Sequence, residues 1–345
     1  MRKGALLLSL CLLAPIGASQ DAQVPALPRG ASKKTREAID RGLKFLEREQ
    51  NRKDGSWRSS GGYGNYPVCM SALCGLALMA DGSSPTRGPY AENVRLCVKF
   101  VLGMQQPNGV YSAPAEESRS MYGHGFGTLF LAQAYGMEED VAKQRTIRES
   151  LDRAIQLIAR SQSRDGGWLY TPDSGGDEGS VTVTQVQALR ACRNAGLHVP
   201  KETIDRAIKY IEKSQNPDGG ISYSVRSRGS RPAITAAACA VLYNAGVYDS
   251  PSAEKCFRYA KDFCSPSSGH AHGHYFYTQL YMSQACWQKG DKEWLPYYEK
   301  IQQYLLQVQE GSGAWNGDSV GHAYGTSIAL LILLLPYSNL PILSR

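Results

Sequence analysis

The chain has 345 residues, and 42% of them are hydrophobic, which is enough apolar material for one large domain or two ordinary ones. Its net charge of +7 is a mild excess without any block of about five or six basic residues. The charge pattern therefore gives no reason to expect nucleic acid or an anionic membrane surface as a partner.

The chain begins with a segment typical of a secretory signal peptide, residues 1–19, "MRKGALLLSLCLLAPIGAS". It has a basic tip, an apolar run too short for a good membrane span, and small residues at its end. We expect cleavage there, an exported protein in the periplasm or outside the cell, and no transmembrane segment in the mature chain. An uncleaved anchor is the alternative. Residues 20–34 are polar, contain proline, and are interpreted as a linker.

Four segments that follow share one pattern, in which an apolar stripe precedes a glutamine and a glycine-containing turn. Apolar or small residues fall 11, 8, 7 and 4 places before Gln50, Gln105, Gln162 and Gln215. Such spacing predicts one face of an amphipathic helix, and the glycine favours a helix end. Cys264 and Gln309 mark a fifth and a sixth copy, so successive copies are 45 to 57 residues apart. Periods of this size indicate repeated helix pairs.

Between these anchors lie segments that are rich in Ala, Leu and Cys and poor in charge. Examples are residues 68–80, 128–137 and 235–246. A helix that is apolar nearly all round is buried. Each repeat therefore predicts one outer and one inner helix. Six repeats predict an all-α domain, an (α/α)6 toroid of twelve helices, over residues 35–345. The cysteines in these helices are interpreted mostly as small buried hydrophobic residues.

The punctuation after the outer helices, seen as "QSRDGGW" at residues 162–168, resembles the glutamine–tryptophan repeat of squalene–hopene cyclases. It is also similar to the repeats of protein prenyltransferase β subunits. The resemblance covers nearly the whole mature chain and implies the same toroid. It further implies that the glutamines, together with Trp57, Trp168 and Trp315, tie helices to one another.

A second motif, Gly-His-x-(Phe/Tyr)-(Gly/Tyr)-Thr, stands at three predicted inner-helix starts, at 123–128, 273–278 and 321–326. The N-termini of the inner helices of a toroid surround one mouth of its cavity. A rim of positive helix ends suits an anionic ligand. The alternative is that these polar residues only satisfy free N–H groups at helix starts. The residues expected at this rim or lining the cavity are His124, His274 and His322, Thr128, Thr278 and Thr326, Arg231, Tyr277 and Tyr324.

Two catalytic or metal hypotheses follow from the same resemblance. Prenyltransferase β subunits hold zinc, which implies a possible zinc site at His272, His274 and His322, although the Asp-x-Cys element of that site is missing. The Asp-x-Asp-Asp acid of the cyclases is missing too, and Asp177 is the candidate general acid in its place. The alternative for Asp177 is a solvated loop with helix-capping carboxylates.

The leading functional hypothesis is an exported toroid that binds a hydrophobic or isoprenoid-like ligand, or a protein partner, through its cavity. The alternatives are an enzyme, either a cyclase-like lyase or a carbohydrate-active toroid, and a purely structural or protein-interaction ring. Cavity chemistry separates them. Two opposed carboxylates favour hydrolysis, an apolar Tyr-lined pocket with a basic rim favours lipid binding, and a filled lumen favours a scaffold.

Overall fold

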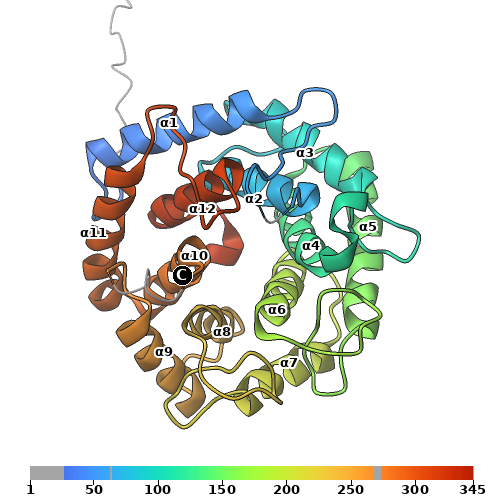
Figure 1. The fold of residues 1–345 in the computed structure, drawn as a ribbon. Helices are drawn as coiled ribbons and strands as arrows, with labels where there is room; N and C mark the ends of the chain where they lie inside the picture. Colours follow the sequence, from blue (N-terminus) through green and yellow to red (C-terminus); the bar gives the residue numbers. More distant parts are fainter. Residues whose placement is uncertain (1–26, 63, 268–272, 345) are drawn as a thin grey trace, which may run out of the picture.

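The computed structural model describes residues 27–344 except 63 and 268–272, and these residues form a ring of twelve α-helices (Figure 1). Outer and inner helices alternate along the chain. The outer helices are α1 (Lys33–Glu49), α3 (Ala91–Gly103), α5 (Val141–Arg160), α7 (Lys201–Lys213), α9 (Pro251–Phe263) and α11 (Asp291–Val308). The inner helices are α2 (Pro67–Ala80), α4 (Ser120–Met137), α6 (Gly179–Asn194), α8 (Pro232–Asn244), α10 (Tyr275–Lys289) and α12 (His322–Leu334).

The ring is closed, because α1 packs against α11 and α12, and α2 packs against α12 (Figure 1). The predicted (α/α)6 toroid is therefore confirmed. Helix α1 begins at Lys33, with Ser32 as its cap, so the first helix starts slightly inside the segment expected to be a linker.

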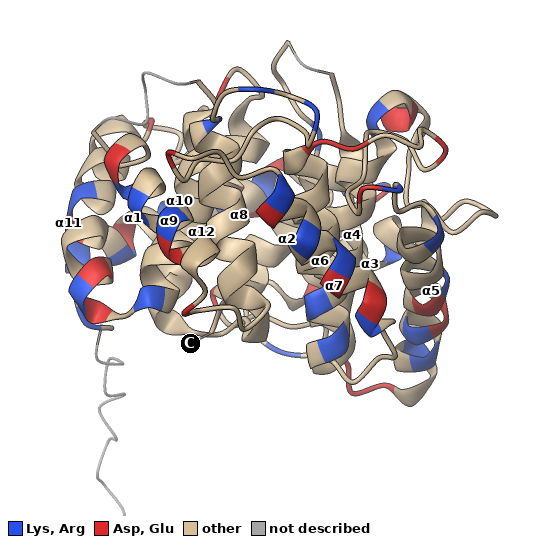
Figure 2. Cartoon of the chain, turned by 90° about the horizontal axis from the view of Figure 1, so that it is seen from below, with Lys and Arg blue, Asp and Glu red and all other residues tan. Residues whose placement is uncertain are grey.

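The two helix layers differ in burial as their sequences predict. All 14 residues of α2 are buried, whereas α7 buries five of its 13 residues along one stripe. In Figure 2 the charged residues gather on the outer helices and on the loops. Burial of the apolar stripes between the layers is what holds the ring together.

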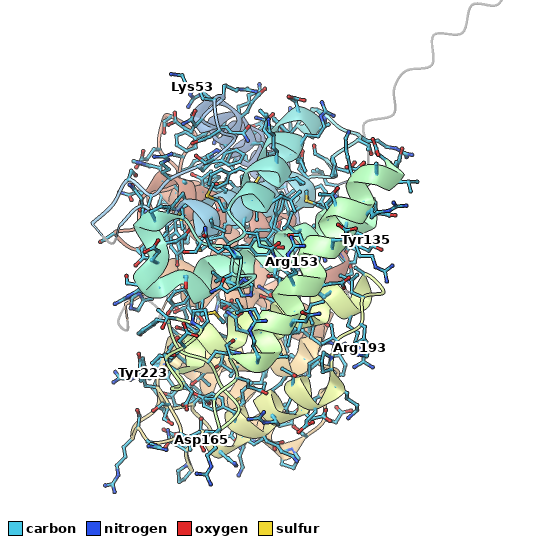
Figure 3. All side chains as sticks on the ribbon, turned by 90° about the vertical axis from the view of Figure 1, so that its right-hand side faces the viewer. Lys53, Tyr135, Arg153, Asp165, Arg193 and Tyr223 are labelled. Atoms are coloured by element: carbon cyan, nitrogen blue, oxygen red, sulfur yellow. The ribbon has the colours of Figure 1, made fainter. Side chains whose placement is uncertain are left out.

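The repeated glutamines act as ties between outer helices, as expected. The Gln162 side chain donates hydrogen bonds to the carbonyl of Gly166 in its own turn (2.8 Å) and to that of Thr203 on the next outer helix (2.9 Å). The same pair of bonds recurs at Gln50, Gln105, Gln215 and Gln309. At the second joint, Arg153 of α5, labelled in Figure 3, also donates to Oε1 of Gln105 at 3.0 Å.

The three tryptophans of the repeat are buried, and each makes the same kind of hydrogen bond. Each indole N–H donates at 2.8 Å to the carbonyl of a residue on the outer helix before it, namely Leu46, Ile158 and Leu305 for Trp57, Trp168 and Trp315. A buried indole N–H needs such an acceptor. The tryptophans therefore fix the turns against the outer layer, away from the lumen.

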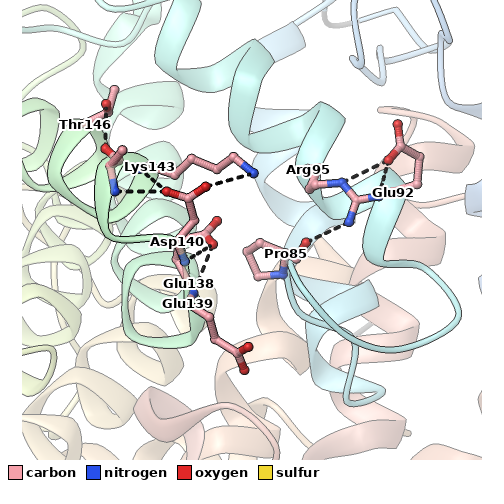
Figure 4. Close-up of polar contacts among 9 residues, drawn as sticks. Pro85, Glu92, Arg95, Glu138, Glu139, Asp140, Lys143 and Thr146 are labelled. Atoms are coloured by element: carbon pink, nitrogen blue, oxygen red, sulfur yellow. Dashed lines mark hydrogen bonds and ion pairs between the residues drawn. The ribbon is translucent and has the colours of Figure 1, made fainter.

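Side-chain caps mark the starts of three outer helices, α1, α5 and α9, and Figure 4 shows the start of α5. Asp140 accepts hydrogen bonds from the main-chain N–H groups of Ala142 (2.9 Å) and Lys143 (3.1 Å). The bond from Lys143 is the main cause that lowers the pKa of this carboxyl. Glu138 accepts the N–H groups of the two residues after it, so the turn between α4 and α5 is held at both ends.

All eight cysteines of the described residues are buried and unpaired, which agrees with their expected role as small hydrophobic residues. Among the described helices, none is both long and apolar enough to cross a bilayer.

Candidate ligand-binding cavity

A cavity of about 700 Å³ lies inside the ring, at the end where the inner helices begin. Its deeper wall is formed by four inner helices, each of which contributes an apolar residue five or six places after its first residue. These residues are Leu73 of α2, Phe126 of α4, Leu280 of α10 and Ile328 of α12. The cavity has the size and lining typical of a small-molecule site.

Tyrosines make up much of the upper wall. They are Tyr66, Tyr122, Tyr170, Tyr223, Tyr277 and Tyr324. The hydroxyl groups of Tyr170 and Tyr223 lie 2.5 Å apart and share a hydrogen bond, and that of Tyr122 lies 2.6 Å from the Ser180 hydroxyl. The hydroxyl groups of these three tyrosines thus have partners near the mouth, while the ring faces extend the apolar wall.

Two arginines stand at the mouth. The guanidinium of Arg119 lies over the ring of Tyr170, 4.8 Å from its centre, and Arg231 is the residue before α8. Both are exposed, and within the described part of the chain neither is in an ion pair with a carboxylate. The cavity therefore presents two positive charges that are free to meet an anion.

Among the described residues that line the cavity, one carries a carboxyl group, Glu178, with 1% of its surface exposed. It is the cap of α6 and accepts hydrogen bonds from the N–H groups of Ser180 (3.0 Å) and Val181 and from the Ser180 hydroxyl (2.7 Å). Burial raises its pKa, against the opposite effect of these hydrogen bonds. A second buried carboxyl, Glu116, caps α2 and is outside the cavity lining.

The carboxyl at the cavity wall belongs to the residue after Asp177, the general acid candidate predicted from the sequence. Asp177 is half-buried beside the Ser163 hydroxyl (3.4 Å) and does not line the cavity, whereas the next residue, Glu178, does. The reason is the helix boundary. Glu178 is the residue directly before α6, so its side chain turns over the helix end and into the lumen.

Of the three motif histidines, only His274 lines the cavity. His124 is fully buried, and its Nδ1 accepts the Tyr111 main-chain N–H at 3.2 Å. Burial lowers the pKa of His124 to about 3. The ring of His322 lies 3.1 Å from both carboxylate oxygens of Glu310, on the outer side. The expectation that the three histidines gather at one rim is corrected.

The motif did not predict the positions of the histidines, because its three copies begin at different distances from the starts of their helices. His124 is the fifth residue of α4, His274 precedes α10, and His322 is the first residue of α12. His124 therefore lies about one turn, or about 6 Å, further along its helix than His322 does along α12.

His124 instead fills a position that holds a hydroxyl in four other repeats. The main-chain N–H groups of Trp57, Trp168, Ile221 and Trp315 are accepted by Ser71, Thr182, Thr235 and Thr326 respectively, at 2.8–3.0 Å. His124 accepts the corresponding N–H in the second repeat. Its part is structural.

The three motif threonines are also absent from the cavity lining. Thr128 and Thr326 are fully buried, and Thr278 donates its hydroxyl to the carbonyl of His274 at 2.8 Å. By contrast, Arg231, Tyr277 and Tyr324 line the cavity where they were expected.

The proposed zinc ligands are not brought together among the described residues. His272, like His270, lies outside them, and His274 and His322 have separate surroundings. Within the described ranges, no group of three or more His, Cys, Asp or Glu side chains is arranged to hold a metal ion.

Sequence reasoning missed Arg119, Glu178 and the tyrosines at 66, 122, 170 and 223. Most of these stand in the connections before inner helices, where the repeats differ from one another. Glu178 carried a usable signal, because an acidic residue directly before an inner-helix start is a candidate cap.

A closed α/α ring with one amphipathic cavity defines the class of protein. The family model of the prenyltransferase alpha-alpha toroid domain matches residues 26–204 and 182–319, and the chain belongs to this family. The resemblance seen in the repeats is thereby confirmed.

The curated relatives match only in part. A drimenyl diphosphate synthase from Streptomyces showdoensis is 27% identical over 169 residues, which are 48% of this chain and 29% of that protein. Another from Streptantibioticus cattleyicolor is 25% identical over 135 residues, or 39% of this chain and 24% of that protein. The matches thus cover less than a third of either relative.

Solved structures share the fold. The type II terpene cyclase MstE from Scytonema has a TM-score of 0.61 at 16% identity, covering 90% of this chain and 100% of that one. An α-1,6-mannanase from Salegentibacter has a TM-score of 0.62 at 10% identity, covering 88% and 98%. At such low identity these likenesses show the ring alone.

Proposed function

We propose that this protein is an exported binding protein whose ring cavity holds an isoprenoid-like amphiphile with an anionic head. The observation that carries the proposal is the pair of arginines, Arg119 and Arg231, at the mouth of a cavity whose wall is mostly apolar and aromatic. The apolar chain lies against Leu73, Phe126 and Ile328, and the head lies between the two guanidiniums.

The energetics favour this orientation. Burying an apolar chain in the deeper cavity contributes about 25 cal/mol for each Å² removed from water. A head with a carboxylate or phosphate oxygen forms charge-assisted hydrogen bonds with arginine, which are about twice as strong as neutral ones. The relatives support the ligand class, since MstE was solved with geranylgeranyl dihydroxybenzoate as its substrate. The proposed export rests on the signal-like residues 1–19.

The other hypotheses have weaker support. Glycoside hydrolysis uses two carboxylates, and the described cavity lining contains one, Glu178. A cyclase-like acid stays open through that same residue, and the Discussion gives its test. A purely structural ring has no need for a cavity of about 700 Å³.

Native mass spectrometry of the mature protein purified from its own host tests the proposal. We expect a population that carries a small molecule, which is released on denaturation and which fragments as an acidic isoprenoid. A protein observed only at its polypeptide mass, or with a bound sugar, contradicts the proposal.

A further inference from the structure

Arg119, at the mouth of the cavity, is held by an aromatic ring, and no carboxylate among the described residues forms an ion pair with it. It is the residue directly before α4, and its guanidinium lies 4.8 Å from the centre of the Tyr170 ring. The main-chain N–H of Met121 donates to the carbonyl of Tyr170 at 3.0 Å, so the start of α4 and this tyrosine are joined twice. A cation over an aromatic face is attracted to it but keeps its full charge.

Two further tyrosines hold the ring of Tyr170 in place. Its hydroxyl lies 2.5 Å from that of Tyr223, whose main-chain carbonyl accepts the N–H of Gly179, the first residue of α6, at 2.9 Å. The ring of Tyr122 on α4 lies 6.0 Å from the Tyr170 ring, a separation typical of interacting aromatic side chains. We call Tyr122, Tyr170 and Tyr223 the tyrosine layer, and all three line the cavity. The layer thus joins the starts of α4 and α6.

The tyrosine layer also contacts the carboxyl of Glu178. The Tyr122 hydroxyl donates to this carboxyl at 3.4 Å. Burial raises the pKa of Tyr223, the Glu178 carboxylate raises it further, and the Arg119 guanidinium lowers it, so both charges lie near this third tyrosine. The two opposite charges contact the layer at different rings, Arg119 at Tyr170 and Glu178 at Tyr122. In the described part of the chain they form no ion pair with each other.

An ion pair between Arg119 and Glu178 would neutralise the positive charge on which anion binding depends. Opposite charges in a cavity of low dielectric attract each other strongly, and the attraction of Arg119 to the Tyr170 face competes with that pairing. We propose that Tyr170 is a positioning residue that holds Arg119 away from Glu178 and so leaves its guanidinium free for the anionic head of the ligand. The inference rests on the proposed function, because it concerns the same site.

A double-mutant cycle tests this inference. Geranylgeranoic acid is titrated by calorimetry into the full mature chain and into Tyr170→Leu, Glu178→Gln and the double variant. The buffer is mildly alkaline, because burial raises the pKa of Glu178 and its carboxyl must be ionised. Tyr170→Leu should lower the affinity for the acid about tenfold or more, since Arg119 then pairs with Glu178. The double variant, which lacks that carboxylate, should bind the acid within about threefold of Glu178→Gln alone.

The neutral alcohol geranylgeraniol distinguishes positioning of Arg119 from packing against the ligand. Its affinity should agree within about threefold among these four proteins, whereas a purely structural role of Tyr170 would lower the affinity for both ligands. Tyr170→Phe keeps the ring beneath Arg119 and should bind the acid within about threefold of wild type. Tyr337→Leu is the matched control, because the guanidinium of Arg36 lies 5.6 Å from the centre of the Tyr337 ring, outside the cavity lining.

Thermal melting shows whether each variant is folded. If Tyr170→Leu does not fold, Tyr170→Met takes its place, since the flexible methionine side chain fills the space without a ring face. An unchanged affinity for the acid in Tyr170→Leu, or a loss that Glu178→Gln does not reverse, overturns the inference and leaves the proposed function intact. If wild-type protein does not bind the acid, the proposed function fails and the inference with it.

Discussion

The side chain of Gln309, at the end of α11, donates a hydrogen bond of 2.9 Å to the carbonyl of Ala38 on α1. The last repeat is therefore joined to the first by the same bond that Gln162 makes to Thr203 between neighbouring repeats. The last and first repeats are therefore linked by the same type of hydrogen bond as two neighbouring repeats within the ring.

Replacing Gln309 with Ala should cost as much stability as Gln162→Ala. Each change removes the same two donated hydrogen bonds at a half-buried site, and we expect a loss of about 1–3 kcal/mol in the free energy of unfolding. Gln309 also accepts a bond from the exposed side chain of Arg41, which adds little. Urea unfolding measures both losses. A negligible effect of Gln309→Ala beside a clear effect of Gln162→Ala would indicate an open superhelix.

His124 should make the protein less stable in mild acid. Its folded pKa, about 3, is below the ordinary 6.5 because of burial, so the unfolded chain binds more protons between these values. The stability that depends on neutral His124 is present above pH 6.5 and is lost as the pH falls toward 3. In His124→Asn, whose amide oxygen can accept the Tyr111 N–H, this part of the pH dependence should vanish. Urea midpoints across this range provide the check, with His322→Asn as control. Parallel pH profiles of wild type and His124→Asn would refute the structural role.

The Glu178→Gln variant distinguishes the binding hypothesis from the cyclase hypothesis. Incubated with geranylgeranoic acid, the wild-type protein should return the compound unchanged, as gas chromatography with mass spectrometry can show. A cyclised product that disappears in Glu178→Gln would instead establish the cyclase-like alternative. A control is needed for the cap, because losing capping bonds costs about 0.5–2 kcal/mol. Both proteins are therefore compared well below their melting temperatures.

The mature protein should begin near residues 18–23. The basic tip, apolar run and small residues before this point form a signal peptide pattern. N-terminal sequencing of secreted material gives the cleavage point directly. Full-length protein confined to the cytosol would count against export.

The fold was largely predictable because the local spacing of apolar residues determines which helices pair. The stripes before Gln50 and its equivalents, and the all-round apolar inner segments, determine which side of each helix is buried. Six copies then leave few ways to bury both ends of the array. Arg231, Tyr277 and Tyr324 were found for the same reason, since they stand at or near inner-helix starts.

The rest of the cavity could not be predicted, for two physical reasons. A motif does not fix how far along its helix a side chain lies, and His124 is the fifth residue of α4 whereas His322 is the first of α12. Arg119, Tyr170 and Tyr223 lie in connections that carry no periodic signal, so only the folded chain shows that they converge.

The central claim is that an anionic head is held at the mouth by arginine. Calorimetric titration of geranylgeranoic acid and its neutral counterpart, geranylgeraniol, tests it most directly. Figure 3 places Tyr223, near the mouth, and Arg193 at opposite ends of the ring, so Arg193→Gln is the matched charge control. We expect the acid to bind wild-type protein more tightly than the alcohol. We also expect Arg119→Gln and Arg231→Gln each to lower the affinity for the acid about tenfold or more, consistent with the loss of a charge-assisted bond of about 1.5–3 kcal/mol. The affinity for the alcohol and the Tm should change little. Equal affinities of acid and alcohol, or an equal loss in Arg193→Gln, would contradict the account.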